Sequence, residues 1–268
     1  MTNNSSLDDL TADVKLEDNA IDAAIAKIAA SRVTMTYIVV INQSTVISDA
    51  DVQAMIPAFS TQWNRDLLPI WDINPATFSF IPKSTIPRDD AWWLVFLDDS
   101  DQAGALAYHD LTNTGQPISK IFAKTLLADK ASISVGATHE LVEMACDPML
   151  NYGAQDASGV FWALENADPV ESDEYGYKIG DVLVTDFVTP SWFGHQYAKA
   201  PFDFAGHTKS AFEVLSGGYA QKFDTTAGWV QVTGSKAKLF SKSMAAVGSR
   251  RERRTRQWKN WERSAAMF

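Results

Sequence analysis

The sequence predicts an α/β protein with a mixed sheet, and three observations support this fold class. Runs of β-branched or apolar residues at 33–42 and 92–97 are typical of buried strands. Apolar residues at helical spacing occupy 48–68, directly after the first run. After more short strands, residues 132–143 are predicted to enter a further helix, which continues until Pro148. Strands that alternate with helices in this order favour one α/β domain.

Local sequence features predict each of the remaining helices and strands. Regular isoleucine spacing predicts a helix at 20–30, and Ser48 is a suitable N-cap for the helix that runs to about Leu68. Four strands are expected next, the second apolar on both faces and the third at a sheet edge: 78–82, 92–97, 103–110 and 117–122. Pro148 ends the last helix, and a loop-rich C-terminal part with a hairpin at 177–188 follows.

Composition limits the classes of function open to the chain. Of its 268 residues, 46% are hydrophobic, which is enough for a large buried core. The net charge of −10 argues against general nucleic-acid binding by the acidic body. The N-terminus lacks the basic and apolar regions of a signal peptide, and no apolar run reaches the roughly 20 residues that cross a bilayer. We therefore expect no transmembrane segment, and a cytoplasmic or virion-associated protein.

Charge divides the chain into three expected parts: a flexible acidic arm at 1–18, a main domain at 19–235 and a basic tail at 236–268. Residues 249–268 hold seven Lys or Arg residues against two acidic ones, with aromatic residues between them. Such a segment either docks on the acidic body of its own chain or is an arm that binds a partner, a phosphate-rich surface or an assembly.

The most informative segment is 137–148, which is predicted to form part of one helix. His139 and Glu143 are four residues apart and therefore lie on the same helix face. Glu140 is the neighbour of His139, where a carboxylate can take a proton from a metal-bound water. The pattern is that of the H-E-x-x-H helix of zinc hydrolases, with Glu in the position of the second His.

A zinc hydrolase takes three protein ligands and leaves one position for water, so a third ligand must join His139 and Glu143. Asp147 lies on the same helix line, but eight helical residues rise about 12 Å, too far for one ion to contact both ends. Asp147 is therefore expected to end the helix or to support the ligands. Asp168 is the favoured third ligand, with Glu165 next, because both lie in an acidic loop downstream.

The other histidines and the cysteine have simpler expected roles. His109, on the predicted edge strand, either faces the cleft and contacts substrate or is a hydrogen-bonded edge residue. His195 and His207 have no motif around them and are expected to be ordinary surface or interface residues. Cys146 is expected to be a small buried hydrophobe, and a single cysteine excludes an internal disulfide.

The helix and the acidic loop together resemble a widespread, poorly characterised group of bacterial and phage-associated proteins. In that group a helix of the form S/T-H-E-hydrophobic-x-E-x-x-x-D-P precedes a loop of the form E-x-x-D-x-C/V-E, and exordium-like proteins show a similar pairing. Residues 138–148 and 165–171 match these forms, with Val170 where many relatives have Cys. The resemblance covers about 33–232 and implies a zincin-like metallopeptidase fold.

The resemblance also implies that His139 and Glu143 bind the metal, that Glu140 is the base, and that Glu165 or Asp168 completes the site. The expected ion is Zn²⁺, although one His with two acids is a harder donor set and another divalent ion is an alternative. The expected function is a zinc-dependent hydrolase that acts on a peptide or protein. The alternatives are a non-catalytic virion, injection-apparatus or cargo protein on a zincin scaffold, with the basic tail as a docking arm, and a degenerate member without metal.

Overall fold

The computed structural model describes residues 34–101, 105–194 and 199–235. The chain divides into two units, Met1–Met35 and Thr36–Phe268, and all the elements below belong to the second unit. The expected acidic arm, the helix at 20–30, the basic tail and His195 lie outside the described residues.

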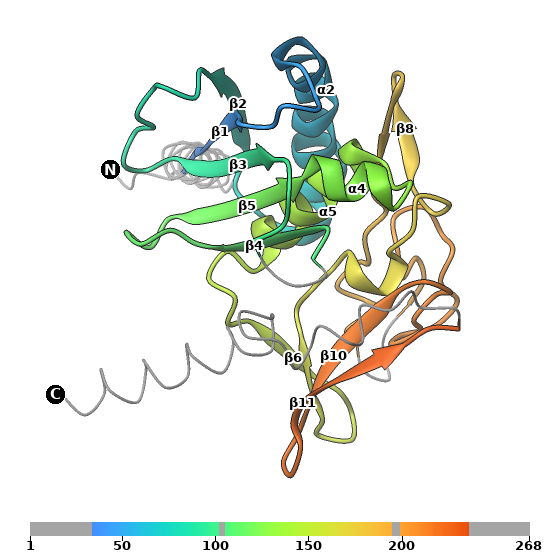
Figure 1. The fold of residues 1–268 in the computed structure, drawn as a ribbon. Coiled ribbons are helices and arrows are strands. Elements are labelled where there is room, and N and C mark those ends of the chain that lie inside the picture. The colour runs from blue at the N-terminus through green and yellow to red at the C-terminus, as the bar shows by residue number, and fades with distance from the viewer. Residues whose placement is uncertain (1–33, 102–104, 195–198, 236–268) are drawn as a thin grey trace, which may run out of the picture. The chain divides into compact units, whose positions relative to one another are not determined.

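Five strands form a mixed sheet in the order β2-β1-β3-β5-β4 (Figure 1). Their bounds are β1 Thr36–Asn42, β2 Ala76–Ile81, β3 Trp92–Leu97, β4 Ala107–Leu111 and β5 Pro117–Phe122. β1 is parallel to β2 and β3, and β3 is parallel to β5, whereas β4 pairs antiparallel with β5 at the edge. The predicted mixed α/β class is therefore confirmed, and so is the edge strand, although it begins at Ala107 instead of residue 103.

Between β1 and β2 lie α2 Asp49–Thr61, the π-helix η1 Gln62–Leu67 and α3 Leu68–Trp71, and after β5 come α4 Ala123–Ala128 and α5 Ile133–Cys146. Ser48 caps α2, as the sequence predicts: its side chain accepts a hydrogen bond from the Asp51 amide, and the Asp51 carboxylate accepts one from the Ser48 amide. The helical segment predicted from 48 to about 68 is present, with a π-helical turn in its second half.

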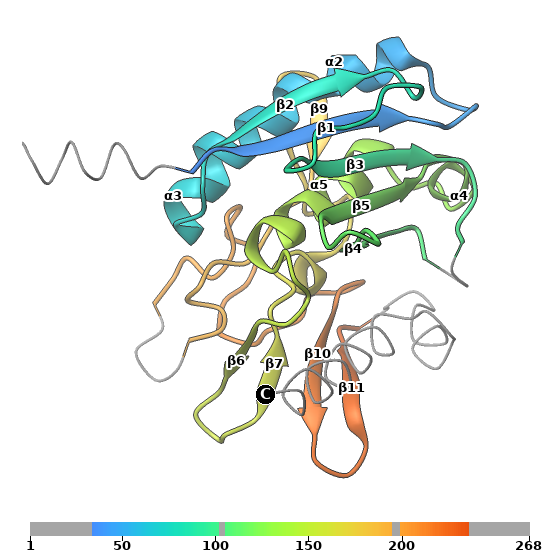
Figure 2. The ribbon, with the colours of Figure 1, turned by 90° about the vertical axis from the view of Figure 1, so that its left-hand side faces the viewer.

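Alternate strand residues face two different clusters. Ile38 and Leu94 pack in the main core with residues of α2 and α5, which therefore cover the same face of the sheet (Figure 2). Val39 and Val95 belong to a smaller cluster on the other face. The prediction that 92–97 is buried on both faces is confirmed in its central residues.

Helix α5 lies against β5 and β4 and is buried along most of its length. Ser132 caps it by accepting a hydrogen bond from the Val135 amide. The helix ends at Cys146, because Asp147 has non-helical backbone angles and precedes a proline. A helix so enclosed holds its polar side chains in the protein interior.

The C-terminal part combines loops with two small sheets. The four-stranded sheet has the order β11-β10-β7-β6, and β8 and β9 form a separate hairpin. Their bounds are β6 Gly153–Gln155, β7 Phe161–Ala163, β8 Tyr177–Ile179, β9 Val182–Val184, β10 Tyr219–Asp224 and β11 Gly228–Thr233, with the 3-10 helix η2 at Asp168–Val170. The hairpin predicted at 177–188 is confirmed in its first part.

In the described part of the chain, no helix is both long enough and apolar enough to span a membrane.

Candidate metal centre

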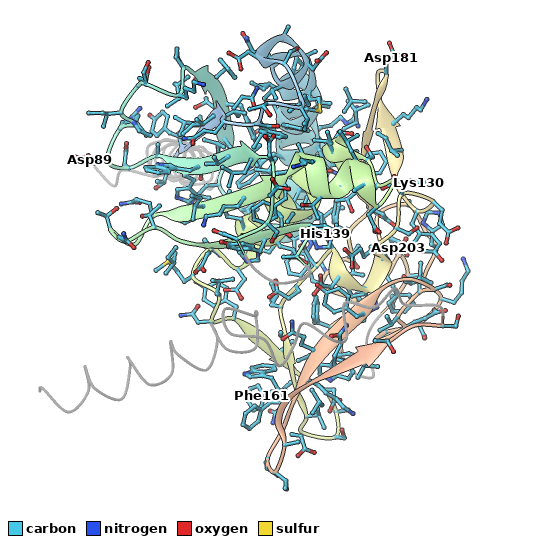
Figure 3. The ribbon with its side chains drawn as sticks, viewed as in Figure 1. Asp89, Lys130, His139, Phe161, Asp181 and Asp203 are labelled. Carbon is cyan, nitrogen blue, oxygen red and sulfur yellow. The ribbon has the colours of Figure 1, made fainter. Side chains whose placement is uncertain are left out.

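The buried part of helix α5 carries His139, Glu140 and Glu143. His139 is 5% exposed, and Glu140 and Glu143 are at most 1% exposed. The Nε2 atom of His139 lies 3.2 Å from Oε1 of Glu143, as expected for side chains one helical turn apart. Figure 3 labels His139 below the edge of the main sheet.

Asp168 reaches this pair from η2. Its Oδ1 atom lies 3.2 Å from His139 Nε2, and the residue is 0% exposed. The ligand atoms of His139, Glu143 and Asp168 all lie within 4.8 Å of one another. The structure thus brings together the three residues that the sequence selects as metal ligands.

Close backbone packing holds the loop that delivers Asp168. The amide of Leu215 donates a hydrogen bond to the carbonyl oxygen of Pro169, at 2.9 Å. A Cβ atom at Gly218 would lie 2.6 Å from the Pro169 carbonyl oxygen and 2.7 Å from that of Asp168. Because side-chain carbons do not approach backbone oxygens so closely, this packing requires glycine at 218.

His109 lies against the motif helix, away from the surface. Its Nδ1 atom is 3.1 Å from Oε2 of Glu140 and 3.6 Å from Oε2 of Glu143. Its Nε2 atom is 3.9 Å from Oε2 of Glu165 and has no hydrogen-bond partner among the described residues. Since the side chain is 0% exposed, the expectation of a direct substrate contact is corrected. The other expectation, a hydrogen-bonded residue on the edge strand, agrees with this position.

The two remaining candidate carboxylates occupy different places. Asp147 Oδ1 accepts hydrogen bonds from the amides of Asn151 and Tyr152, at 2.8 and 3.0 Å, and so organises the turn that follows α5. Glu165 faces His109. Asp168, the favoured third ligand, is therefore the loop carboxylate that contacts His139.

Carboxyl groups are concentrated in and around the centre, in the protein interior. Five carboxylates are at most 2% exposed: Glu140, Glu143, Asp147, Glu165 and Asp168. Burial tends to lower the pKa of His139, but the charge of Glu143 and hydrogen bonds with Asp168 and Glu143 raise that pKa well above its ordinary value. Carboxylates gathered in the interior are costly unless a cation compensates them.

The donor set fits a divalent metal ion. One imidazole nitrogen with carboxylate oxygens suits Zn²⁺, and its oxygen-rich character also suits Mn²⁺. The side chain of His139 keeps 6% of its surface exposed, whereas Glu143 and Asp168 keep none. Among these three side chains, only that of His139 is therefore in contact with solvent.

Cys146 is the buried residue that its sequence context predicts. Burial, followed by the charges of Glu143 and Asp147, raises the pKa of its thiol well above the ordinary value. Its sulfur accepts a hydrogen bond from Asn166 Nδ2, at 3.2 Å. A buried thiol that resists ionisation is not suited to nucleophilic chemistry.

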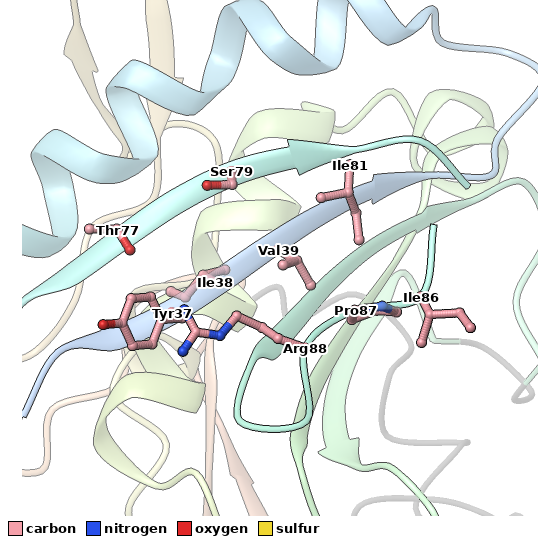
Figure 4. A pocket seen from close by; sticks show the side chains of 9 residues that line it. All are labelled: Tyr37, Ile38, Val39, Thr77, Ser79, Ile81, Ile86, Pro87 and Arg88. Carbon is pink, nitrogen blue, oxygen red and sulfur yellow. The ribbon is translucent and has the colours of Figure 1, made fainter. Parts of the chain in front are cut away.

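A pocket lies elsewhere, over β1 and β2 (Figure 4). Tyr37, Val39 and Arg88 help to line it, and the guanidinium carbon of Arg88 stands 3.8 Å from the centre of the Tyr37 ring. No residue of the metal-ligand group lines this pocket. The pocket is therefore separate from the candidate metal centre.

The structure contains a group that sequence reasoning missed. The ligand atoms of Asp186, Asp203 and His207 lie within 4.8 Å of one another. His207, which the sequence predicts to be an ordinary surface or interface residue, contacts both aspartates. Asp203 and His207 are four residues apart, but they lie outside any helix, so no periodic pattern indicates that they meet.

The sequence matches no protein-family model, and comparisons with curated proteins and with solved structures give no match either. The function must therefore be inferred from the chemistry of the site itself.

Proposed function

We propose that this protein is a zinc-dependent hydrolase with a zincin-like core, and that its substrate is a peptide or a protein. The observation that carries the proposal is the convergence of His139, Glu143 and Asp168 in the interior, with Glu140 beside them on the same helix. The mixed sheet and the buried helix packed against it support the assignment of the core.

In this proposal the residues of the centre have distinct roles. His139, Glu143 and Asp168 would hold the zinc ion, which supplies Lewis acidity and lowers the pKa of a water molecule to about 7. Glu140 would act as the general base, which takes a proton from a water molecule and passes it to the departing amine. His109 would hold the Glu140 carboxylate in place through the 3.1 Å contact between its Nδ1 atom and Oε2 of Glu140.

The depth of the ligand group favours a second candidate function. Of the three ligands, His139 alone keeps any exposed surface, and that is 6% of its side chain. A catalytic zinc needs an open position that substrate can reach, whereas a structural zinc is enclosed. The second candidate is therefore a non-catalytic scaffold that a metal ion stabilises.

Metal content decides whether the centre binds zinc. Elemental mass spectrometry of the purified protein and of His139→Ala should show the loss of one zinc per chain in the variant. Equal zinc in both proteins, or none in the wild type after zinc is supplied, would refute the centre.

A peptide-library assay then separates the two candidates. The hydrolase predicts cleavage by the wild type and no cleavage by Glu140→Gln, which keeps its zinc. Zinc binding at His139 without any cleavage in the wild type supports the scaffold.

A further inference from the structure

A second group of metal-ligating side chains lies in the C-terminal part of the chain. It consists of Asp186, Asp203 and His207, and we refer to it as the Asp-Asp-His cluster. Nδ1 of His207 lies 3.2 Å from Oδ2 of Asp186 and 3.5 Å from Oδ2 of Asp203. Both aspartates are 0% exposed, whereas 35% of the His207 side chain is exposed. Figure 3 labels Asp203.

The backbone orients the first carboxylate. Oδ1 of Asp186 accepts hydrogen bonds from the amides of Phe187 and Ala205, at 2.8 and 3.0 Å. These bonds leave Oδ2 directed at His207. The carboxylate is therefore held in place by main-chain groups on two segments.

The second carboxylate is held in a similar way. Oδ1 of Asp203 accepts hydrogen bonds from the amide and the hydroxyl of Thr208, and its Oδ2 accepts one from the His207 amide. This Oδ2 also faces the imidazole of His207. Two carboxylate oxygens and one imidazole nitrogen thus point to one place.

The segment that carries Asp186 is tied to the motif helix. The amide of Thr185 donates to Oγ1 of Thr138, at 2.9 Å, and the carbonyl of Thr185 accepts from Nε2 of Gln62, at 2.7 Å. Gln62 itself is 1% exposed and belongs to the π-helix η1. The cluster is therefore preorganised by the buried core.

In the part of the chain that the structure describes, neither aspartate of the cluster pairs with Lys or Arg. Asp186 and Asp203 both pair with His207 instead. Two buried carboxylates that lie together repel each other unless a proton or a cation lies between them. The exposed edge of His207 gives a cation from solvent access to this position.

We propose that the Asp-Asp-His cluster is a second metal site, which binds a divalent transition metal such as Zn²⁺. The imidazole nitrogen favours a transition metal over Ca²⁺ or Mg²⁺, which prefer oxygen ligands alone. The ion joins the segment after β9 to the segment that carries Asp203 and His207. Its role is structural, and it goes beyond the hydrolase proposed above.

Zinc stoichiometry tests the second site independently of the first. The wild type, His207→Ala, His139→Ala and the double variant are loaded with Zn²⁺, desalted and measured by elemental mass spectrometry. We expect two zinc ions per chain in the wild type, one in each single variant and none in the double variant. His207→Ala keeps the backbone amide that binds Asp203, so its fold is expected to persist.

Asp181→Asn is the matched control, because it removes an exposed carboxylate from the tip of the β8–β9 hairpin (Figure 3). This control should bind as much zinc as the wild type. Equal zinc in His207→Ala and the wild type overturns the second site and leaves the proposed hydrolase intact. Loss of zinc in His207→Ala but not in His139→Ala supports the second site and refutes the zinc centre of the proposed hydrolase.

Thermal unfolding adds a second readout. In the His139→Ala background, zinc should raise the midpoint of unfolding, and the added His207→Ala change should abolish this rise. A rise that persists in the double variant overturns the assignment. If His139→Ala does not fold, the comparison of zinc content between the wild type and His207→Ala still decides.

Discussion

Nδ1 of His109 lies 3.1 Å from Oε2 of Glu140, and this contact joins the edge strand β4 to helix α5 in the interior of the protein. The same nitrogen is 3.6 Å from Glu143. A buried imidazole that holds a carboxylate fixes the orientation of that carboxylate. In the proposed hydrolase, His109 is therefore a positioning residue for the base Glu140 and does not bind substrate.

His109→Ala should lower kcat about 10- to 100-fold while KM and zinc content stay close to the wild type, because the change removes the support of Glu140 but no metal ligand. Peptide-cleavage kinetics and elemental mass spectrometry would measure this. His109→Gln, which retains a side-chain donor, should recover part of the lost kcat. A variant that has lost its zinc, or that keeps full kcat, would contradict the positioning role.

Glu140→Gln and Glu143→Gln make a matched pair on the same helix. Both replace a carboxylate by an amide of the same shape. We expect Glu140→Gln to retain zinc and lose turnover, because it removes the base, and Glu143→Gln to lose zinc, because it removes a ligand. Zinc content and peptide cleavage of both variants are the measurements. A reversed result would exchange the two assignments.

Gly218→Ala should disturb the proposed zinc centre, although Gly218 is not one of its ligands. The new Cβ would lie 2.6 Å from the carbonyl oxygen of Pro169, so the turn that carries Asp168 must shift. We expect a loss of about 1–3 kcal/mol in the free energy of unfolding and weaker zinc binding. Urea unfolding and zinc titration would measure the two effects.

Gly115→Ala is the control for that prediction. Gly115 has φ of 83°, so alanine is strained there, but a Cβ would meet no atom within 4 Å. The expected cost is about 1–2 kcal/mol of stability with no change in zinc affinity. If Gly218→Ala also leaves zinc affinity unchanged, the packing of Gly218 does not position Asp168.

Local sequence patterns predict those parts of the fold that depend on residues close together in the sequence. The strands at 92–97 and 117–122 have the predicted bounds, and the first of them is a short apolar run that ends at turn-forming residues. His139 and Glu143 meet because a helix brings together residues four apart. The choice of Asp168 rested on a family resemblance and an acidic loop, and the structure places that residue beside His139.

Contacts that depend on tertiary packing escaped prediction. The position of His109 is set by the pairing of β4 with β5 and by the packing of α5 against both strands. His207 contacts Asp186 and Asp203 through irregular segments. No periodic sequence pattern predicts the path of such segments. The helical spacing of the apolar residues before Gln62–Leu67 likewise does not predict the π-helical turn in that segment.

The metal-free protein should lose stability as the pH rises, because of Asp186. Burial, and then the hydrogen bond and charge of Asp203, raise the pKa of Asp186 from 3.8 to about 8. Between these two values the folded protein holds a proton that the unfolded chain releases. The free energy of unfolding therefore falls with increasing pH in this range.

Urea unfolding of chelator-treated protein at pH values from about 4 to about 8 would measure this dependence. Asp186→Asn should flatten it, because the amide stays neutral at every pH and its oxygen can still accept from the amides of Phe187 and Ala205. Asp181→Asn, at an exposed position, should keep the wild-type slope. Equal slopes in the wild type and Asp186→Asn would mean that Asp186 holds no proton in the folded state, and that another group neutralises the Asp-Asp-His cluster.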